Sequence, residues 1–102
     1  MDYHEDYYHA FLAGIFVGRG YEVISNKERG LGRPDILLLD RDHRRALIIE
    51  AKKSDSADRM NQDCDEALKQ IVDREYARGL EDWTVLSYGI AFYQENALVK
   101  KL

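Results

Sequence analysis

Residues 34–52 decide the fold, and they read Pro-Asp-Ile-Leu-Leu-Leu-Asp-Arg-Asp-His-Arg-Arg-Ala-Leu-Ile-Ile-Glu-Ala-Lys. Two near-continuous apolar runs, at 35–39 and 46–52, are separated by the six turn-rich polar residues 40–45. This pattern predicts an antiparallel β-hairpin whose strands are covered on both faces. Pro34 is acceptable at the first position of a strand and biases the preceding residue to extended geometry. Other elements must therefore pack on each side of the hairpin.

The residues before the hairpin predict a helix, a strand and a loop. Apolar residues recur at steps of three and four over residues 3–16, which indicates an amphipathic helix of about four turns. A short β-rich stretch follows at 21–25. Residues 26–33 are polar, basic and contain two glycines, which is typical of a loop.

The residues after the hairpin predict a second helix and two closing strands. Capping-type residues at 54–58 precede an apolar stripe at helical spacing that continues to Tyr76 and is ended by Gly79. Strands are predicted at 83–93 and 97–99, and the three residues between them form the turn. The order of helix, three strands, helix and two strands predicts an α/β fold with a mixed β-sheet flanked by helices.

Length and composition set the limits of this fold. A chain of 102 residues with 45% hydrophobic content predicts one compact domain over residues 1–102. No apolar run approaches the roughly 18 residues of a membrane span, and the acidic start does not resemble a signal peptide, so we expect a cytoplasmic protein with no membrane contact. Cys64 is the single cysteine, which excludes an internal disulfide and a thiolate zinc cluster; its place on the apolar stripe indicates a core residue.

The net charge of −4 has the wrong sign for a protein that binds nucleic acid by bulk electrostatics. The charge is unevenly distributed, however. Residues 19–53 carry +3, whereas residues 54–82 carry −5. If two acids of the basic segment were ligands of a divalent metal, that segment would present a positive patch to a polyanion.

Three charged residues lie at the polar ends of the predicted hairpin strands, where packing gives no reason for them. Asp35 opens one strand, and alternation places Glu50 and Lys52 on one face near the end of the other. Mg²⁺ prefers hard oxygen ligands, and Asp35, Glu50 and the backbone carbonyl of Ala51 fit that preference. Lys52 beside the metal suits stabilisation of the charge that gathers on phosphorus during phosphodiester hydrolysis. The alternative is a structural Glu50–Lys52 ion pair.

Pro34-Asp35, a spacer of fourteen residues and Glu50-Ala51-Lys52 resemble the motif of the PD-(D/E)XK nuclease superfamily. The wider sequence is similar to the C-terminal nuclease-like domain of AAA-ATPase-like proteins. The segments that carry this similarity are Glu5-Asp6-Tyr7-Tyr8-His9, Tyr21-Glu22-Val23, Ser25-Asn26, Gly30-Leu31-Gly32-Arg33-Pro34-Asp35, Ala67-Leu68-Lys69-Gln70-Ile71, Tyr76 and Tyr88-Gly89-Ile90-Ala91-Phe92. The chain departs from that branch in its net acidity and in lacking the ATPase domain that normally comes first.

The resemblance implies a restriction-endonuclease-like core of αβββαβ order and a Mg²⁺- or Mn²⁺-dependent deoxyribonuclease. It implies catalytic roles for Asp35, Glu50 and Lys52, and a supporting role for Glu5 of the first helix. Gln70, with Tyr76, matches an extended motif of the exonuclease-like and resolvase-like branches; the alternatives are a solvated helix residue for Gln70 and a core residue for Tyr76. By analogy with small resolvases, we expect a homodimer that acts on junction or branched DNA, with an ATPase domain as a partner in relatives.

Basic residues near the predicted site are candidates for contact with DNA phosphates. The predicted nucleic-acid-binding residues are Lys27, Arg29, Arg33, Lys53 and Tyr76. The hairpin arginines Arg41, Arg44 and Arg45 lie at the opposite end of the strands, so we interpret them as solvated. His4, His9 and His43 lack the spacing of helical metal ligands.

Two other functions fit the same residues. A catalytically silent module that binds nucleic acid or a protein partner would use the acidic segment 54–82 as its docking surface. A regulatory Mg²⁺ site would bind metal without turnover. Asp35→Ala distinguishes them from a nuclease, since only a nuclease loses metal-dependent cleavage.

Overall fold

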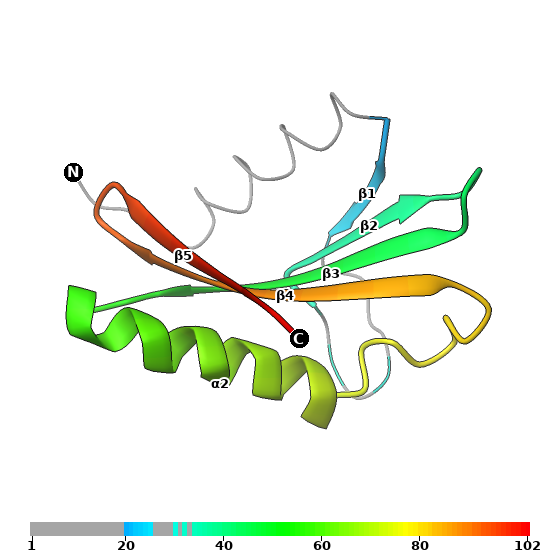
Figure 1. Cartoon of the computed structure of the whole chain (residues 1–102). Helices are drawn as coiled ribbons and strands as arrows, with labels where there is room; N and C mark the ends of the chain where they lie inside the picture. The colour runs from blue at the N-terminus through cyan, green and yellow to red at the C-terminus, as the bar shows by residue number, and fades with distance from the viewer. Residues whose placement is uncertain (1–19, 26–29, 31, 33) are drawn as a thin grey trace.

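The computed structural model describes residues 20–25, 30, 32 and 34–102, which form a five-stranded sheet with a helix along one face (Figure 1). The elements are β1 (Glu22–Ser25), β2 (Ile36–Asp40), β3 (Arg45–Lys53), the 3₁₀ turn η1 (Ala57–Arg59), α2 (Met60–Asp73), β4 (Thr84–Tyr93) and β5 (Asn96–Lys101). The strands lie in the sheet in chain order, with β3 and β4 parallel and every other pair antiparallel. The predicted α/β fold with a mixed sheet is thus confirmed. The helix predicted at 3–16 lies outside the described residues.

The β2–β3 hairpin is confirmed, with each strand within one residue of its predicted bounds. Its antiparallel register runs from Ile36 opposite Ile49 to Asp40 opposite Arg45. Alternation along the strands divides the core between the two faces of the sheet. One face buries Ile36, Leu38, Leu47, Ile49, Ala51, Ile90 and Phe92. The other face, toward α2, buries Leu37, Leu39, Ala46, Ile48, Ile71, Tyr76 and Leu80.

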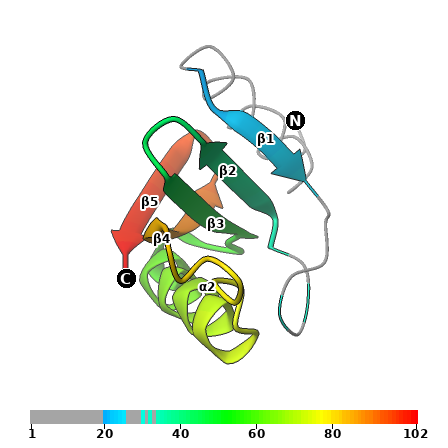
Figure 2. The ribbon, with the colours of Figure 1, turned by 90° about the vertical axis from the view of Figure 1, so that its right-hand side faces the viewer.

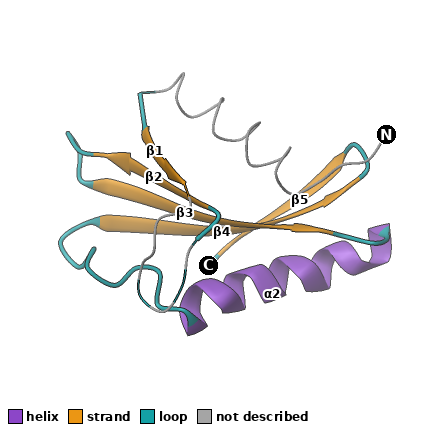
Figure 3. Ribbon diagram, turned by 180° about the vertical axis from the view of Figure 1, so that it is seen from behind, coloured by secondary structure: helices purple, strands orange, loops and turns teal. Residues whose placement is uncertain are grey.

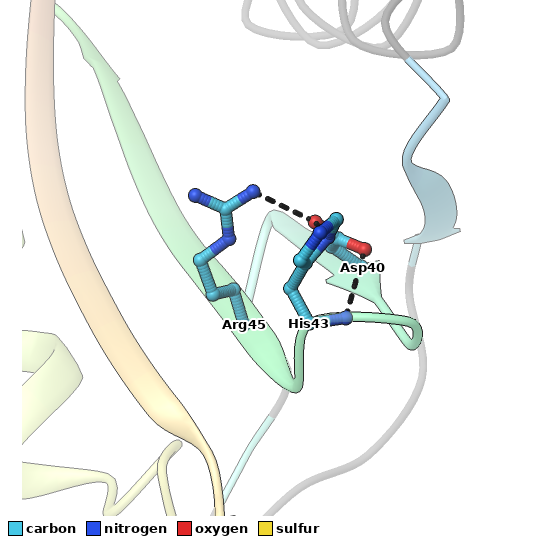
Figure 4. Close-up of polar contacts among 3 residues, drawn as sticks. All are labelled: Asp40, His43 and Arg45. Atoms are coloured by element: carbon cyan, nitrogen blue, oxygen red, sulfur yellow. Dashed lines mark hydrogen bonds and ion pairs between the residues drawn. The ribbon is translucent and has the colours of Figure 1, made fainter.

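The tip of this hairpin is held by polar contacts around Asp40 (Figure 4). Arg45 donates a hydrogen bond of 2.9 Å to Asp40, and the backbone N–H of His43 donates another of 3.4 Å. The bond from Arg45 is the largest cause of the lowered pKa of Asp40. Arg41 pairs with Glu22 of β1 at 2.6 Å. Arg41 and Arg45 are exposed, as predicted. Their ion pairs stabilise the tip of the hairpin and connect it to β1.

Helix α2 packs on the sheet through one stripe (Figure 2). Its buried residues are Met60, Asp63, Cys64, Ala67 and Ile71. Cys64 is fully buried, as predicted, and donates a hydrogen bond of 3.1 Å to the carbonyl of Leu98. Asp63 accepts a bond of 2.6 Å from the hydroxyl of Ser54, which satisfies a buried carboxylate. Val72, predicted on the stripe, is 54% exposed. No helix in the described part of the chain is long and apolar enough to cross a membrane.

The closest approach of α2 to the sheet occurs at Gly89 of β4. A Cβ atom at Gly89 would lie 2.6 Å from the backbone carbonyl oxygen of Cys64 and 3.1 Å from the Cβ of Ala67. Only glycine leaves space for the helix backbone at this position. Gly89 lies opposite Glu50 in the parallel pairing of β3 and β4, so this contact sets the height of α2 above that end of β3.

Helix α2 ends six residues before Gly79, and the predicted continuation to Tyr76 is wrong. The backbone N–H of Glu75 bonds to Val72 at 3.1 Å, and that of Tyr76 bonds to Ile71 at 3.2 Å. This is the Schellman pattern, in which the residue after the cap takes a left-handed conformation and is usually glycine. Here that residue is Glu75, with φ of 52°. A loop then leads from α2 to β4 (Figure 3).

Of the closing strands, β5 is longer than predicted, whereas β4 is one residue shorter. β4 begins at Thr84, and β5 extends from Asn96 to Lys101 rather than from 97 to 99. Tyr93 pairs with Asn96, which shortens the turn to two residues. Gln94 in this turn has φ of 53°, as a tight hairpin turn requires.

Substitution of Gly89 by alanine tests the close packing of α2 on β4. We expect Gly89→Ala to lower the free energy of unfolding by about 1–3 kcal/mol, because the added methyl group meets backbone that can only shift as a unit. Urea denaturation followed by circular dichroism measures this change. An unaltered midpoint would contradict the packing described at this position.

Candidate active site

The candidate site lies where the β2–β3 ladder stops. Ile36 and Ile49 form its last pair, and Asp35 and Glu50 come next on the two strands. The backbone N–H of Asp35 donates 3.0 Å to Oε1 of Glu50, and the backbone N–H of Ala51 donates 2.8 Å to Oδ2 of Asp35. The two strands thus exchange side-chain bonds in place of ladder bonds. This exchange fixes both carboxylates beside each other at the end of the hairpin.

The site concentrates negative charge in a buried place. Glu50 is only 2% exposed. Burial and then the negative charge of Asp35 raise the pKa of Glu50 to about 7, against the opposing effects of the Asp35 N–H and the positive charge of Lys52. Two carboxylates this close repel each other unless a proton or a cation lies between them. The site is therefore built to receive positive charge.

Lys52 is held by a chain of hydrogen bonds from α2. Its Nζ donates a bond of 2.9 Å to Oε1 of Gln70, and Nε2 of Gln70 donates a bond of 3.2 Å to the hydroxyl of Tyr76. Glu50 and Lys52 are two residues apart on β3 and share the face that α2 covers. A flexible lysine side chain is thereby held on the face of the sheet that carries Glu50.

The donor set suits a hard divalent cation. Asp35 and Glu50 offer adjacent carboxylate oxygens, and the neighbouring Ala51 has a backbone carbonyl oxygen; oxygen ligands of this kind are those that Mg²⁺ and Mn²⁺ prefer. Burial and the negative charge of Asp35 raise the pKa of Glu50, and a bound cation would offset both effects. Among residues 20–25, 30, 32 and 34–102, no three His, Cys, Asp or Glu side chains gather as a metal site. The two carboxylates would need a backbone carbonyl and water to complete the shell.

The structure brings together four of the residues predicted for catalysis: Asp35, Glu50, Lys52 and Gln70. Their roles remain predictions. Glu5, the fifth, lies outside the described residues. The predicted phosphate contacts Lys27, Arg29 and Arg33 lie there too. Lys53 is exposed at the end of β3, and alternation turns it to the face opposite Lys52.

Tyr76 requires a correction. Its side chain is 1% exposed and packs in the core with Leu37, Ile48 and Ile71, so the predicted contact between this ring and nucleic acid does not fit the structure. Its hydroxyl instead accepts the bond from Gln70. Burial raises the pKa of the Tyr76 hydroxyl, which therefore stays protonated in the site.

Sequence reasoning missed Arg74, which lies in the turn after α2 beside Gly32. The apolar stripe suggested that the helix continues through this position, and a helical Arg74 would have no reason to lie beside the segment that precedes Asp35. Glu75 in a left-handed conformation gives no sequence signal, since glycine is the usual residue there.

Comparison with protein-family models gives a match over almost the whole chain. A family model described as the PD-(D/E)XK nuclease superfamily matches residues 3–102. No curated protein matches the chain.

The raised pKa of Glu50 predicts how stability depends on pH in the absence of metal. The folded chain holds the Glu50 proton up to about pH 7, whereas the unfolded chain releases it near pH 4.5. The free energy of unfolding should therefore fall as pH rises between these values, by no more than about 1.4 kcal/mol per pH unit from this one group. Urea unfolding in EDTA across this range measures the slope.

Glu50→Gln should remove this contribution and flatten the slope. Glu66→Gln is the matched control, because Glu66 is an exposed carboxylate on α2 and its replacement should keep the wild-type slope. Equal slopes for the wild type and Glu50→Gln would contradict the buried carboxylate pair.

Proposed function

The chain belongs to the PD-(D/E)XK nuclease superfamily, and from that premise we propose that it is a divalent-metal-dependent nuclease that hydrolyses DNA phosphodiester bonds. The observation that carries the proposal is the pair of hydrogen bonds that Asp35 exchanges with the Glu50 side chain and the Ala51 backbone, with Lys52 held by Gln70 on the same face of the sheet as Glu50. The catalytic roles assigned below are part of this proposal.

Asp35, Glu50 and the carbonyl of Ala51 would hold Mg²⁺ or Mn²⁺. When bound, such an ion lowers the pKa of a coordinated water and stabilises charge on the phosphoryl oxygens. The backbone N–H groups of Asp35 and Ala51 keep both carboxylates oriented before metal or substrate arrives. This preorganisation lowers the cost of assembling the site.

Lys52 would orient the attacking water and stabilise the negative charge that develops on the phosphate. Gln70 is a positioning residue, because it holds the Lys52 ammonium through its Oε1 atom. Tyr76 acts one step further away by holding Gln70. Glu5 is proposed to support the metal site, as the resemblance implies.

The finer predictions belong to the same proposal. We propose that the nuclease acts as a homodimer on branched or junction DNA, that relatives join it to an ATPase domain, and that it works in the cytoplasm. Light scattering measures the oligomeric state. A panel of supercoiled, linear, single-stranded and four-way-junction DNA shows which form is cleaved fastest.

Removal of a metal ligand or of the lysine tests catalysis directly. We expect the wild type to cleave DNA in Mg²⁺ or Mn²⁺ and not in EDTA, and Asp35→Asn and Lys52→Ala each to lower kcat by about 100-fold or more, because charge stabilisation on the phosphate is lost. Lys101→Ala is the matched control, since Lys101 is exposed on β5 and its loss should leave cleavage unchanged.

Absence of metal-dependent cleavage on every substrate would overturn the nuclease. Thermal stabilisation by Mg²⁺ in that case, lost in Asp35→Asn, would identify a regulatory metal site. DNA binding that persists in Lys52→Ala without any metal effect would identify a silent binding module.

Tyr76→Phe tests the chain of hydrogen bonds behind Lys52. The ring and its packing remain, but Gln70 loses its acceptor, so we expect kcat to fall by about fivefold with a smaller effect on KM. Tyr93→Phe, which removes a hydroxyl at the β4–β5 turn, is the control and should behave as the wild type. A change in KM alone would contradict the positioning role.

A further inference from the structure

The turn that follows α2 is packed against the glycines that precede Asp35. Gly30 has φ of 54°, and a Cβ atom there would collide with the backbone carbonyl oxygens of Arg74 and Glu75. A Cβ at Gly32 would lie 3.3 Å from the ring of Tyr76. The two segments are thus in backbone contact although more than 40 residues separate them in sequence. This contact fixes the turn at residues 74–76 beside the strand that carries Asp35.

Arg74 projects from this turn toward the carboxylate end of the sheet. Its Nη1 atom would lie 3.1 Å from a Cβ at Gly32, three residues before Asp35. The hydroxyl of Tyr76 experiences the positive charge of Arg74 and the negative charges of Glu50 and Asp35. The same Cβ at Gly32 would lie 3.4 Å from the hydroxyl of Tyr76, so Arg74 lies near the chain of hydrogen bonds that ends at Lys52.

The acidic neighbours of Arg74 are engaged elsewhere. Asp73 pairs with Lys69 at 2.7 Å, and Glu75 pairs with Arg78 at 2.6 Å. Arg74 itself is exposed, and within the described part of the chain its guanidinium makes no hydrogen bond or ion pair. The guanidinium of Arg74 lies beside the segment that leads into Asp35, and the acidic residues next to it are paired with other cations, so it is available for an anion.

We propose that Arg74 binds a backbone phosphate of the nucleic acid beside the Asp35–Glu50 pair. This proposal rests on the proposed nuclease function and adds a substrate-binding residue to it. The planar guanidinium suits bidentate contact with phosphate oxygens. Its charge also offsets the repulsion that the two carboxylates exert on an approaching phosphodiester. The left-handed Glu75 and the Gly30 contact hold the turn from which Arg74 reaches the site.

The test measures DNA binding separately from hydrolysis. Binding of a fluorescein-labelled DNA duplex with a single-stranded tail is followed by fluorescence anisotropy in EDTA, over a series of salt concentrations. Arg74→Gln should weaken binding about tenfold. It should also reduce the slope of log K against log salt by about 0.7–0.9, the loss of one phosphate contact. Arg74→Lys keeps the positive charge but lacks the planar guanidinium. Its affinity for DNA should therefore lie between those of the wild type and Arg74→Gln.

Arg44→Gln is the matched control. Arg44 is an exposed arginine in the hairpin turn, at the opposite end of β3 from Glu50. Its replacement should therefore leave both the affinity for DNA and the salt slope at wild-type values. Equal thermal midpoints of the two variants show that the fold is retained.

Several outcomes would overturn the proposal: wild-type affinity and slope in Arg74→Gln, equal losses in both variants, or no DNA binding by the wild type. Cleavage in Mg²⁺ or Mn²⁺ is measured on the same proteins. A wild type that binds through Arg74 but cleaves no DNA supports the phosphate contact and refutes the nuclease. Cleavage by the wild type, with no effect of Arg74→Gln on DNA binding, supports the nuclease and refutes the phosphate contact.

Discussion

The exchange of hydrogen bonds at the open end of the β2–β3 hairpin is the constraint on which the site depends. A strand pair that diverges leaves backbone N–H groups without partners, and burial makes that costly. Here the N–H groups of Asp35 and Ala51 are satisfied by carboxylates, those of Glu50 and Asp35 respectively. The bonds that close the sheet therefore also hold two like charges together. The two carboxylates stay together despite their repulsion because each accepts one of these backbone hydrogen bonds.

The second requirement is the height of α2 above the sheet. Gly89 lets the helix backbone approach β4 closely, and Gln70, three residues after the contacting Ala67, then reaches Lys52. A larger residue at Gly89 would lift the helix and lengthen the Gln70–Lys52 bond. The contact of Gly89 with α2 thus sets both the packing of the helix and the orientation of Lys52. The geometry of the site therefore depends on the packing of the core.

The end of α2 links the site to the segment before Asp35. Glu75 accepts a left-handed conformation that glycine would adopt at lower cost, and this lets the chain turn so that Tyr76 is buried and Arg74 faces Gly32. Strain of this kind persists where surrounding contacts fix the backbone. The contact with Gly30 supplies that fixation. Buried carboxylates, a held lysine and an exposed guanidinium then share one end of the sheet.

The sequence by itself determined the order of the elements, the β2–β3 hairpin and the shared face of Glu50 and Lys52, because apolar periodicity and strand alternation are local properties. It also indicated Asp35, Glu50, Lys52 and Gln70 as one group. Only the tertiary structure decided where α2 ends, that Tyr76 is buried and that Arg74 lies beside Gly32. These depend on contact between Gly30 and Glu75, which are far apart in the chain, and no local pattern records such a contact.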